Sequence, residues 1–337
     1  MDDYIAIQRC ILLAKSSGGW VHPNPKVGCI IVHNHKVIGE GRHHKSGGHH
    51  AEVMALSSVE EKDKNLIKYS TLYVNLEPCC HFGKTPPCTD LIISNGIKNV
   101  VIGVSDPNPK VSGKGIKCLK KAGVNVKVGI YEIECIELNK RFFHSIQKGL
   151  PYVVIKWAES SDGYIDKSRN SLNSKPIKIS SPSMQPIVHS WRSKEQAILI
   201  GIKTFLTDRP ILNVRLSSGP DPIKIIWISK LIKKNKLDLE NAFKEGWIIW
   251  GPNAHESAND ALLRHLKESG LRSILVEGGA ETIKYFFKAS IWNECRIIKN
   301  EKKLGNGVAA PLIPESHSPR KVYSIDKNKV SIYFNPK

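Results

Sequence analysis

Three residues of the kinds that bind zinc stand at turning points in a pattern of alternating helices and strands. His50 comes directly before an apolar helical stretch. Cys79 follows an apolar strand over 71–76, and Cys88 opens another helical stretch. We expect both cysteines near helix N-termini, which favour the thiolate form. Alternation of this kind predicts α/β layers around one sheet.

The trio has the composition of a catalytic zinc site, with one imidazole and two thiolates. These ligands leave the fourth tetrahedral position of Zn²⁺ free for water, whose pKa the metal lowers to about 7. Glu52 lies two residues after His50, and a carboxylate there can take the water's proton and hand it to a departing amine. His-x-Glu followed by Pro-Cys and a second Cys is the signature of zinc nucleobase deaminases.

The spacing of the two cysteines departs from that signature, which has two residues between them. Eight residues separate Cys79 from Cys88, and Cys80 and His81 within this insert are alternative ligands. Adjacent cysteines cannot easily reach one metal from regular backbone, so we favour Cys79 over Cys80. The remaining cysteines are predicted to be small core residues: Cys10, Cys29, Cys118, Cys135 and Cys295.

Length and charge limit the alternatives. The chain has 337 residues, which favours two domains. Its 50 Lys and Arg against 31 Asp and Glu would suit nucleic acid. That excess is spread over both halves, however, without an Arg-rich run or interleaved aromatics, so we expect no nucleic-acid partner. No apolar run is long enough to span a membrane. The eight cysteines and the absence of a signal pattern favour a reducing cytoplasm.

A domain boundary is predicted near Lys148–Pro151, which gives a first domain over 1–147 and a second over 151–337. Helices are expected in the first domain at 3–17, 51–58, 88–95, 113–122 and 132–147. Strands are expected at 27–32, 71–76, 99–104 and 124–128, and a further strand that follows 27–32 is expected to end at Gly39. In the second domain the expected strands are 152–158, 196–200, 223–228, 246–250 and 272–276, and the helices 183–192, 257–269 and 280–288. Two Lys- and Asn-rich segments, 230–245 and 299–306, are interpreted as surface loops.

Four motifs in the first half make the chain resemble the bifunctional riboflavin-biosynthesis deaminase/reductase family. They are His-Pro-Asn-Pro-Lys-Val-Gly at 22–28, Gly-Glu-Gly at 39–41, His-Ala-Glu-Val at 50–53 and Leu-Glu-Pro-Cys-Cys-His-Phe-Gly-Lys-Thr-Pro-Pro-Cys at 76–88. The resemblance implies a cytidine-deaminase-like three-layer α/β/α domain. It assigns zinc to His50, Cys79 and Cys88, the proton transfer to Glu52, and substrate contacts to Asn24, His43 and Lys84. His43 is preferred over His44 because the family has its His seven positions before the zinc ligand; His49 stands where the family usually has Pro.

The second half resembles the reductase part of the same family, which has a dihydrofolate-reductase-like α/β fold and uses NADPH. The matching segments are 156–163, 189–192, 201–215 and 276–279. The resemblance implies cofactor contacts for Lys156, Ala158, Thr204, Asp208, Ser229, Gly279 and Ala280. It implies contacts with the phosphorylated substrate for Arg192, Leu212, Arg215 and Glu277. The chain departs from the family pattern at Pro176, Lys178 and Trp227.

The resemblance implies two reactions on a small phosphorylated pyrimidine. The first is zinc-dependent hydrolytic deamination of 2,5-diamino-6-(5-phosphoribosylamino)pyrimidin-4(3H)-one. The second is NADPH-dependent reduction of the ribosyl group to give 5-amino-6-(5-phosphoribitylamino)uracil. A homo-oligomer, dimer or tetramer, is also expected. Three alternatives stay open: an active deaminase with a degenerate reductase, a deaminase acting on transfer RNA, and a non-catalytic protein with a closed structural zinc.

Overall fold

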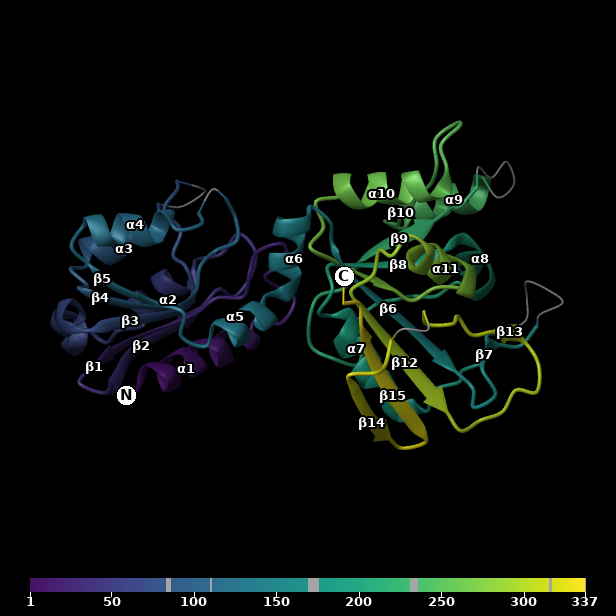
Figure 1. Cartoon of the computed structure of the whole chain (residues 1–337), viewed down its shortest axis with the longest axis horizontal. Coiled ribbons are helices and arrows are strands. Elements are labelled where there is room, and N and C mark those ends of the chain that lie inside the picture. Colours follow the sequence, from purple (N-terminus) through teal and green to yellow (C-terminus); the bar gives the residue numbers. More distant parts are fainter. Residues whose placement is uncertain (83–85, 110, 169–175, 231–235, 315–316, 337) are drawn as a thin grey trace. The chain divides into compact units, whose positions relative to one another are not determined.

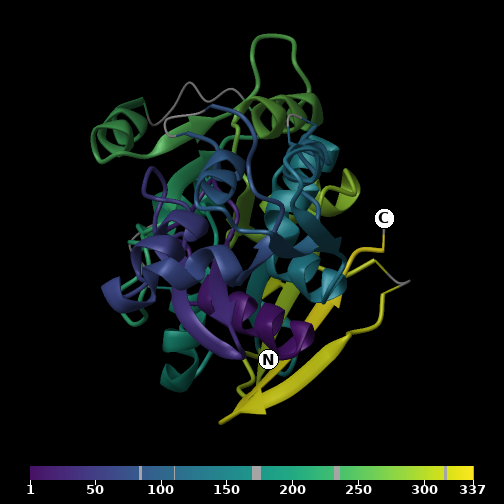
Figure 2. The same cartoon turned by 90° about the vertical axis from the view of Figure 1, so that its left-hand side faces the viewer.

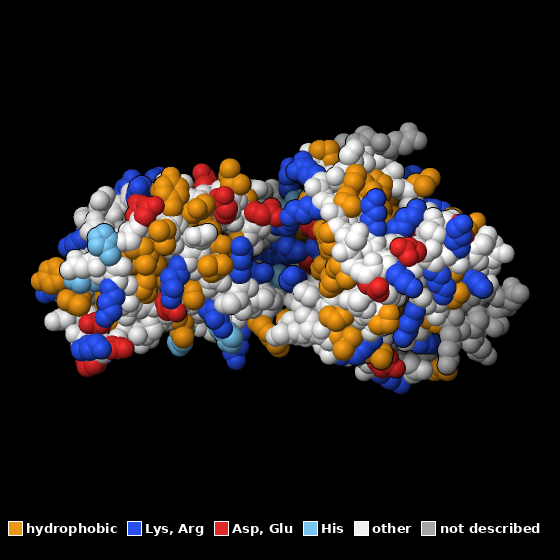
Figure 3. Space-filling view, turned by 90° about the horizontal axis from the view of Figure 1, so that it is seen from below, with side chains coloured by type: hydrophobic (Ala, Val, Ile, Leu, Met, Phe, Trp, Pro, Cys, Tyr) orange, Lys and Arg blue, Asp and Glu red, His pale blue; other side chains and the backbone are white. Residues whose placement is uncertain are grey.

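Two units, Met1–Gly149 and Leu150–Lys337, make up the chain, and Figure 1 shows their elements. The computed structural model describes residues 1–82, 86–109, 111–168, 176–230, 236–314 and 317–336. In these residues no helix is both long and apolar enough to cross a membrane. On the face that Figure 3 shows, Lys and Arg side chains occur over both units, among acidic and apolar ones.

The first unit is built on a five-stranded mixed sheet in the order β2-β1-β3-β4-β5. The strands are β1 (Gly28–His33), β2 (Lys36–Arg42), β3 (Thr71–Leu76), β4 (Asn99–Val104) and β5 (Asn125–Val128). β1 runs antiparallel to β2 and β3, whereas β3, β4 and β5 are parallel. The carboxyl ends of β3 and β4 therefore meet at one edge.

Helices cover both faces of this sheet and complete three layers. α1 (Asp3–Lys15), α5 (Glu132–Leu138) and α6 (Lys140–Lys148) lie on one face. α2 (Ala51–Ser57), α3 (Cys88–Ser94) and α4 (Lys114–Lys121) lie on the other, and the 3₁₀ helix η1 (Glu61–Tyr69) precedes β3. Both Figure 1 and Figure 2 show α1, in purple, on the side of the sheet opposite α3 and α4. Successive strand residues point to opposite faces of the sheet. Because helices cover both faces, the strands carry apolar residues on both sides.

The single helix predicted over 132–147 is two helices, α5 and α6, which are separated at Asn139. The Asn139 side chain accepts a hydrogen bond from the Lys26 backbone N–H at 2.7 Å and donates one to the Lys26 carbonyl at 2.9 Å. These two hydrogen bonds hold Asn139 against the backbone at Lys26, at the position where α5 ends and α6 begins. The break thus depends on a tertiary contact that helical periodicity does not reveal.

The second unit is built on an eight-stranded sheet in the order β10-β9-β8-β11-β6-β12-β15-β14. The strands are β6 (Tyr152–Glu159), β8 (Ala197–Gly201), β9 (Ile223–Trp227), β10 (Ile248–Trp250), β11 (Ser273–Val276), β12 (Glu294–Asn300), β14 (Lys321–Ile325) and β15 (Asn328–Phe334). The first six strands in that order are parallel, and β15 and β14 are antiparallel additions. β7 (Tyr164–Asp166) pairs separately with β13 (Val308–Ala309).

Helices also cover both faces of the second sheet. α10 (Ala258–Glu268) and α11 (Ala280–Lys288) pack on one face, and α8 (Ile202–Asp208) and α9 (Lys236–Lys244) on the other. The short helix η2 (Pro182–Met184) leads into α7 (Gln185–Arg192), which packs against β12 and β15. A surface loop was predicted over 230–245. This prediction is wrong for residues 236–244, which form α9, and residues 231–235 lie outside the described part of the chain.

Candidate active sites

The three predicted zinc ligands lie together in the first unit. His50 directly precedes α2, Cys79 follows β3, and Cys88 begins α3. Nδ1 of His50 lies 3.2 Å from Sγ of Cys88 and 3.6 Å from Sγ of Cys79. In a tetrahedral site with Zn–S bonds of about 2.3 Å and Zn–N bonds of about 2.0 Å, N and S lie about 3.5 Å apart. The donor set and its spacing therefore fit one zinc ion with a position left for water.

The two thiols form a hydrogen-bonded pair. Sγ of Cys79 accepts a hydrogen bond from the Cys88 backbone N–H at 3.3 Å. The hydrogen bond from the Cys88 thiol, together with His50 and this N–H, lowers the pKa of Cys79 to about 4 despite its burial. The thiol–thiol bond in turn raises the pKa of Cys88. Cys88 does begin a helix, but the expectation of a helix start at Cys79 is wrong: the thiolate there is favoured by hydrogen bonds.

Glu52 lies in the first turn of α2, and only 3% of it is exposed. Burial raises the pKa of its carboxyl group, which His50 partly offsets. The carboxyl group also interacts with the Cys88 thiol, so it lies next to the zinc ligands without belonging to their set. A buried carboxyl group with a raised pKa can both accept and release a proton near neutral pH.

Two of the predicted substrate contacts lie beside this centre. The side-chain amide of Asn24 lies 3.0 Å from Nε2 of His43. Nδ1 of His43 lies 2.9 Å from the His49 carbonyl oxygen, and its ring packs edge-on to the ring of His50 at 5.8 Å. Burial lowers the pKa of His43, whereas His44 is exposed. The third predicted contact, Lys84, lies outside the described residues.

Glu77, which the sequence did not single out as a site residue, supports the segment that carries Cys79. The buried Glu77 carboxylate accepts hydrogen bonds from the backbone N–H groups of Asp106, Gly113 and Ile116 at 3.1, 3.0 and 3.2 Å. It thereby ties the segment before Cys79 to the segment after β4. Its place directly after a buried strand and before Pro-Cys was the available signal.

The second unit has a cavity of about 720 Å³. It includes every reductase residue predicted from the resemblance except Leu212, which is 5% exposed and packs in the core under α8. The predicted residues that line it are Lys156, Ala158, Arg192, Thr204, Asp208, Arg215, Ser229, Glu277, Gly279 and Ala280. The three positions that depart from the family pattern, Pro176, Lys178 and Trp227, line it too. Its size suits a drug-sized or cofactor-sized ligand.

A buried charge cluster lies in this cavity. Glu277, at the carboxyl end of β11, accepts two hydrogen bonds from the Arg192 guanidinium at 2.8 and 2.9 Å. Lys156 Nζ lies 3.5 Å from the same carboxylate. Burial would raise the pKa of Glu277, but the charges of Lys156 and Arg192 outweigh it and lower that pKa to about 2. Glu277 is therefore ionised at neutral pH.

The turn that carries two of the predicted cofactor contacts, Gly279 and Ala280, begins α11. Gly279 is the N-cap residue with φ +61°, a conformation that favours glycine. A Cβ atom on Gly279 would lie 3.0 Å from Oγ1 of Thr204. Both residues line the cavity, and free N–H groups at a helix start suit a phosphate. The turn therefore fits the diphosphate of a dinucleotide cofactor.

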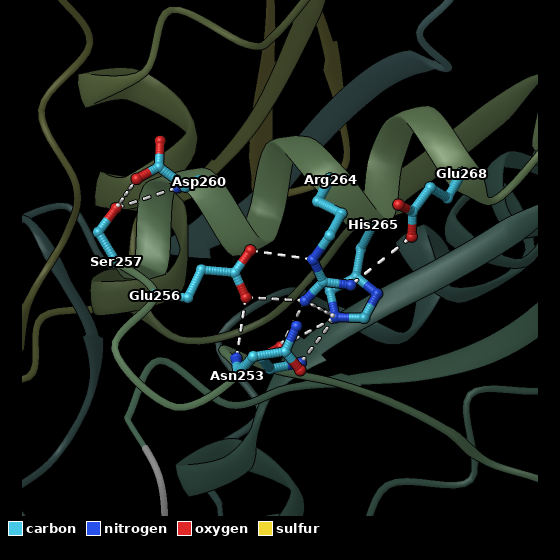
Figure 4. A network of polar contacts seen from close by, with 8 residues as sticks. Asn253, Glu256, Ser257, Asp260, Arg264, His265 and Glu268 are labelled. Atoms are coloured by element: carbon cyan, nitrogen blue, oxygen red, sulfur yellow. Dashed lines mark hydrogen bonds and ion pairs between the residues drawn. The ribbon is translucent and has the colours of Figure 1, made fainter.

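A polar network, which Figure 4 shows, fixes the segment that follows β10. The Arg264 guanidinium donates two hydrogen bonds of 2.9 Å to the Glu256 carboxylate. The His265 ring stacks on Trp250 at 5.2 Å, and its Nε2 lies 2.9 Å from the Gly251 carbonyl oxygen. The charges of Arg264 and Glu256 thus pair with each other. We therefore interpret the network as structural.

Two family models match the chain. The cytidine and deoxycytidylate deaminase zinc-binding region matches residues 2–104, and the RibD C-terminal domain matches residues 151–331. The first match contains both ligand-bearing segments, and the second contains the cavity.

Relatives match either most of the chain or a little under half of it. The riboflavin biosynthesis protein RibD of Aquifex aeolicus is 37% identical over 315 residues, which cover 88% of this chain and 86% of that protein. The diaminohydroxyphosphoribosylamino-pyrimidine deaminase of Buchnera aphidicola subsp. Schizaphis graminum is 52% identical over 151 residues, 45% of this chain and 100% of the relative. A crystal structure of a diaminohydroxyphosphoribosylaminopyrimidine deaminase/5-amino-6-(5-phosphoribosylamino)uracil reductase from Thermotoga maritima has a TM-score of 0.86 and 32% identity, and the match covers 98% of each chain.

Proposed function

The chain belongs to the family of the riboflavin biosynthesis protein RibD, and we propose that its two units catalyse successive reactions on one phosphorylated pyrimidine. The first unit deaminates 2,5-diamino-6-(5-phosphoribosylamino)pyrimidin-4(3H)-one. The second reduces the ribosyl group of the product to ribityl. The observation that carries this proposal is the presence, in one chain, of a three-ligand zinc site beside Glu52 and of a cofactor-sized cavity around Glu277.

In the first unit we assign zinc to His50, Cys79 and Cys88. Zinc held by these three residues would supply a water activated as a nucleophile near neutral pH. Glu52 takes a proton from the attacking water and delivers it to the leaving amine, so that water is consumed and ammonia is released. Asn24 and His43, which are hydrogen-bonded to each other, hold the substrate beside the metal.

In the second unit NADPH supplies the hydride, and the chain's residues provide binding and orientation. We assign the cofactor to the side of the cavity formed by Thr204, Asp208, Ser229 and the turn at Gly279–Ala280. Lys156, with Ala158 beyond it on the same strand, completes that side. Glu277 holds Arg192 and Lys156 in fixed positions, while Arg215 and the backbone near Leu212 are assigned to the substrate.

The test follows ammonia and NADPH absorbance together when the purified chain is given the diaminopyrimidine phosphate. We expect one ammonia released and one NADPH oxidised per substrate. Ammonia without NADPH oxidation would select a degenerate reductase. If ammonia is not released and NADPH is not oxidised, the proposal is contradicted. Two further predictions, a homo-oligomer and a cytoplasmic location, need light scattering and cell fractionation.

A further inference from the structure

His189 is a buried cavity residue that the two reactions described above leave without a role. It lies on α7 three residues before Arg192, so both side chains share one face of the helix. Only 3% of His189 is exposed, yet it lines the reductase cavity. Its Nδ1 accepts a hydrogen bond from the backbone N–H of Arg215 at 3.0 Å. It therefore joins α7 to the loop that carries Arg215.

This hydrogen bond fixes the tautomer of the ring. A nitrogen that accepts from an N–H carries no proton, so the proton of neutral His189 is on Nε2. Burial and the charges of Arg192 and Arg215 lower the pKa of His189, which keeps the ring neutral at pH 7. Within the described part of the chain, Nε2 has no hydrogen-bond partner. It is thus a donor available to a ligand in the cavity.

Two arginines lie close to His189. Arg192 and Arg215 line the same cavity, and their charges act on the ring against those of Glu277 and Asp221. The Arg192 guanidinium already uses three of its five N–H donors: it makes two hydrogen bonds to Glu277 and one of 3.4 Å to the Asn213 carbonyl oxygen. A phosphate monoester brings a charge of about −2 and three acceptor oxygens. The two N–H donors that remain on Arg192 are fewer than these three oxygens, so further donors are needed.

We propose that His189 binds the 5-phosphate of the reductase substrate, with Nε2–H donating to a phosphate oxygen while Nδ1 holds the Arg215 loop. This inference rests on the proposed function of the second unit. It makes His189 a residue that selects phosphorylated over unphosphorylated substrate. The ring donates without becoming charged, and Arg215 supplies the positive charge from the loop that the same ring positions.

Two substitutions separate the roles of the two ring nitrogens: Nε2–H as the donor to the phosphate, and Nδ1 as the anchor that accepts from the Arg215 backbone N–H. In His189→Asn the amide oxygen occupies the position of Nδ1 and can still accept from the Arg215 N–H, but the Nε2–H donor is lost. In His189→Gln the amide nitrogen reaches the position of Nε2 and restores the donor, while the anchor is lost. A hydrogen bond to a charged group contributes about 10- to 100-fold in affinity. With 5-amino-6-(5-phosphoribosylamino)uracil we expect KM to rise by that factor for His189→Asn and by less than about threefold for His189→Gln.

The same assay with the substrate lacking its 5-phosphate is the control. We expect the loss of kcat/KM caused by His189→Asn to be much smaller on that compound than on the phosphorylated substrate, because the phosphate that His189 contacts is absent. Equal KM of wild type and His189→Asn on the phosphorylated substrate would overturn the inference, as would equal losses for the two variants. A wild-type chain that oxidises no NADPH would instead contradict the proposed function.

A second measurement needs no enzymatic activity and uses the His189→Gln variant only to assign a resonance. In the ¹⁵N-histidine-labelled full chain, ribose 5-phosphate is added in the presence of NADPH, and the Nε2 resonance missing from the His189→Gln spectrum is followed. We expect that resonance to shift on addition of ribose 5-phosphate but not of ribose. An unchanged resonance would show that the phosphate does not reach His189.

Discussion

At the scale of single residues, environment distinguishes side chains that the sequence lists side by side. His43 and His44 are neighbours, but only His43 is buried and in contact with Asn24. Cys79 and Cys80 are neighbours, but of the described residues only Cys79 joins His50 and Cys88 in a possible metal site. In both pairs the motif spacing selects the residue that lies with the other candidate site residues. It was not enough to find contacts such as that of His189, which depend on distant loops.

The role of Glu52 is tested by Glu52→Gln. The amide keeps the size of the side chain but cannot carry a proton, so we expect ammonia release to fall by about 10²- to 10⁴-fold. Zinc content, measured by metal analysis, should be unchanged because Glu52 is not among the ligands. Full retained ammonia release would remove the proton-carrying role from this residue. NADPH oxidation with the deaminated substrate supplied directly is the internal control.

The charge cluster in the second unit is tested by Glu277→Gln, which leaves Arg192 and Lys156 without their buried counter-charge. We expect a loss of about 3–5 kcal/mol in the unfolding free energy of this unit at pH 7 and loss of NADPH oxidation, with ammonia release retained. Urea unfolding followed by tryptophan fluorescence reports mainly on this unit, because six of the seven tryptophans are in it.

The same variant gives a prediction on pH. The folded-state pKa of Glu277 is about 2, below the ordinary value of 4.5. Its ionised form therefore stabilises the folded state fully above about pH 4.5, and this contribution disappears as the pH falls towards 2. The difference in unfolding free energy between wild type and Glu277→Gln should narrow below pH 4.5. A difference that stays constant from pH 7 to pH 3 would contradict the low pKa.

At the scale of elements, apolar strands and long amphipathic helices were predictable and mixed segments were not. The bounds of β3, β4 and α11 are those expected from the sequence, since each is a continuous apolar or periodic run. α9 was missed because its Lys-, Asn- and Glu-rich sequence buries few positions, chiefly Ala242. β12, β14 and β15 were also missed because charged residues such as Arg296 and Lys299 interrupt the alternation. Arg296 is buried, pairs with Glu294 and lies over the Trp191 ring.

The position of α2 against β2 is set by a glycine, and Gly41→Ala tests it. A Cβ atom at this position would lie 2.4 Å from the backbone nitrogen of Ala55 and 2.7 Å from the carbonyl oxygen of Ala51. Backbone atoms cannot move aside as a side chain does, so α2 must shift, at a cost of about 1–3 kcal/mol. We expect weaker zinc binding in a competition titration and reduced ammonia release, because α2 carries Glu52 and begins at His50.

The matched control for this substitution is Ser57→Ala, on the exposed surface of the same helix. It should leave zinc affinity and ammonia release unchanged. If Gly41→Ala behaves like Ser57→Ala, the close approach of helix and strand does not determine the geometry of the metal site.

At the scale of the whole molecule, each unit has its own sheet, cores and functional residues. The proposed zinc ligands all lie before Gly149, and the residues that line the reductase cavity all follow Leu150. A relative with a complete length of 151 residues corresponds to the first unit alone. The two chemistries therefore require different cofactors at sites built from separate parts of the chain.

Removal of zinc should consequently affect only one of the two reactions. After treatment with a chelator, we expect ammonia release to be lost, because the nucleophilic water depends on the metal held by His50, Cys79 and Cys88. NADPH oxidation with 5-amino-6-(5-phosphoribosylamino)uracil supplied directly should continue at the original rate, and added zinc should restore ammonia release. Cys88→Ser should behave like the chelated protein, but zinc should restore it little or not at all. Loss of NADPH oxidation on chelation would show instead that the second unit depends on the folded state of the first.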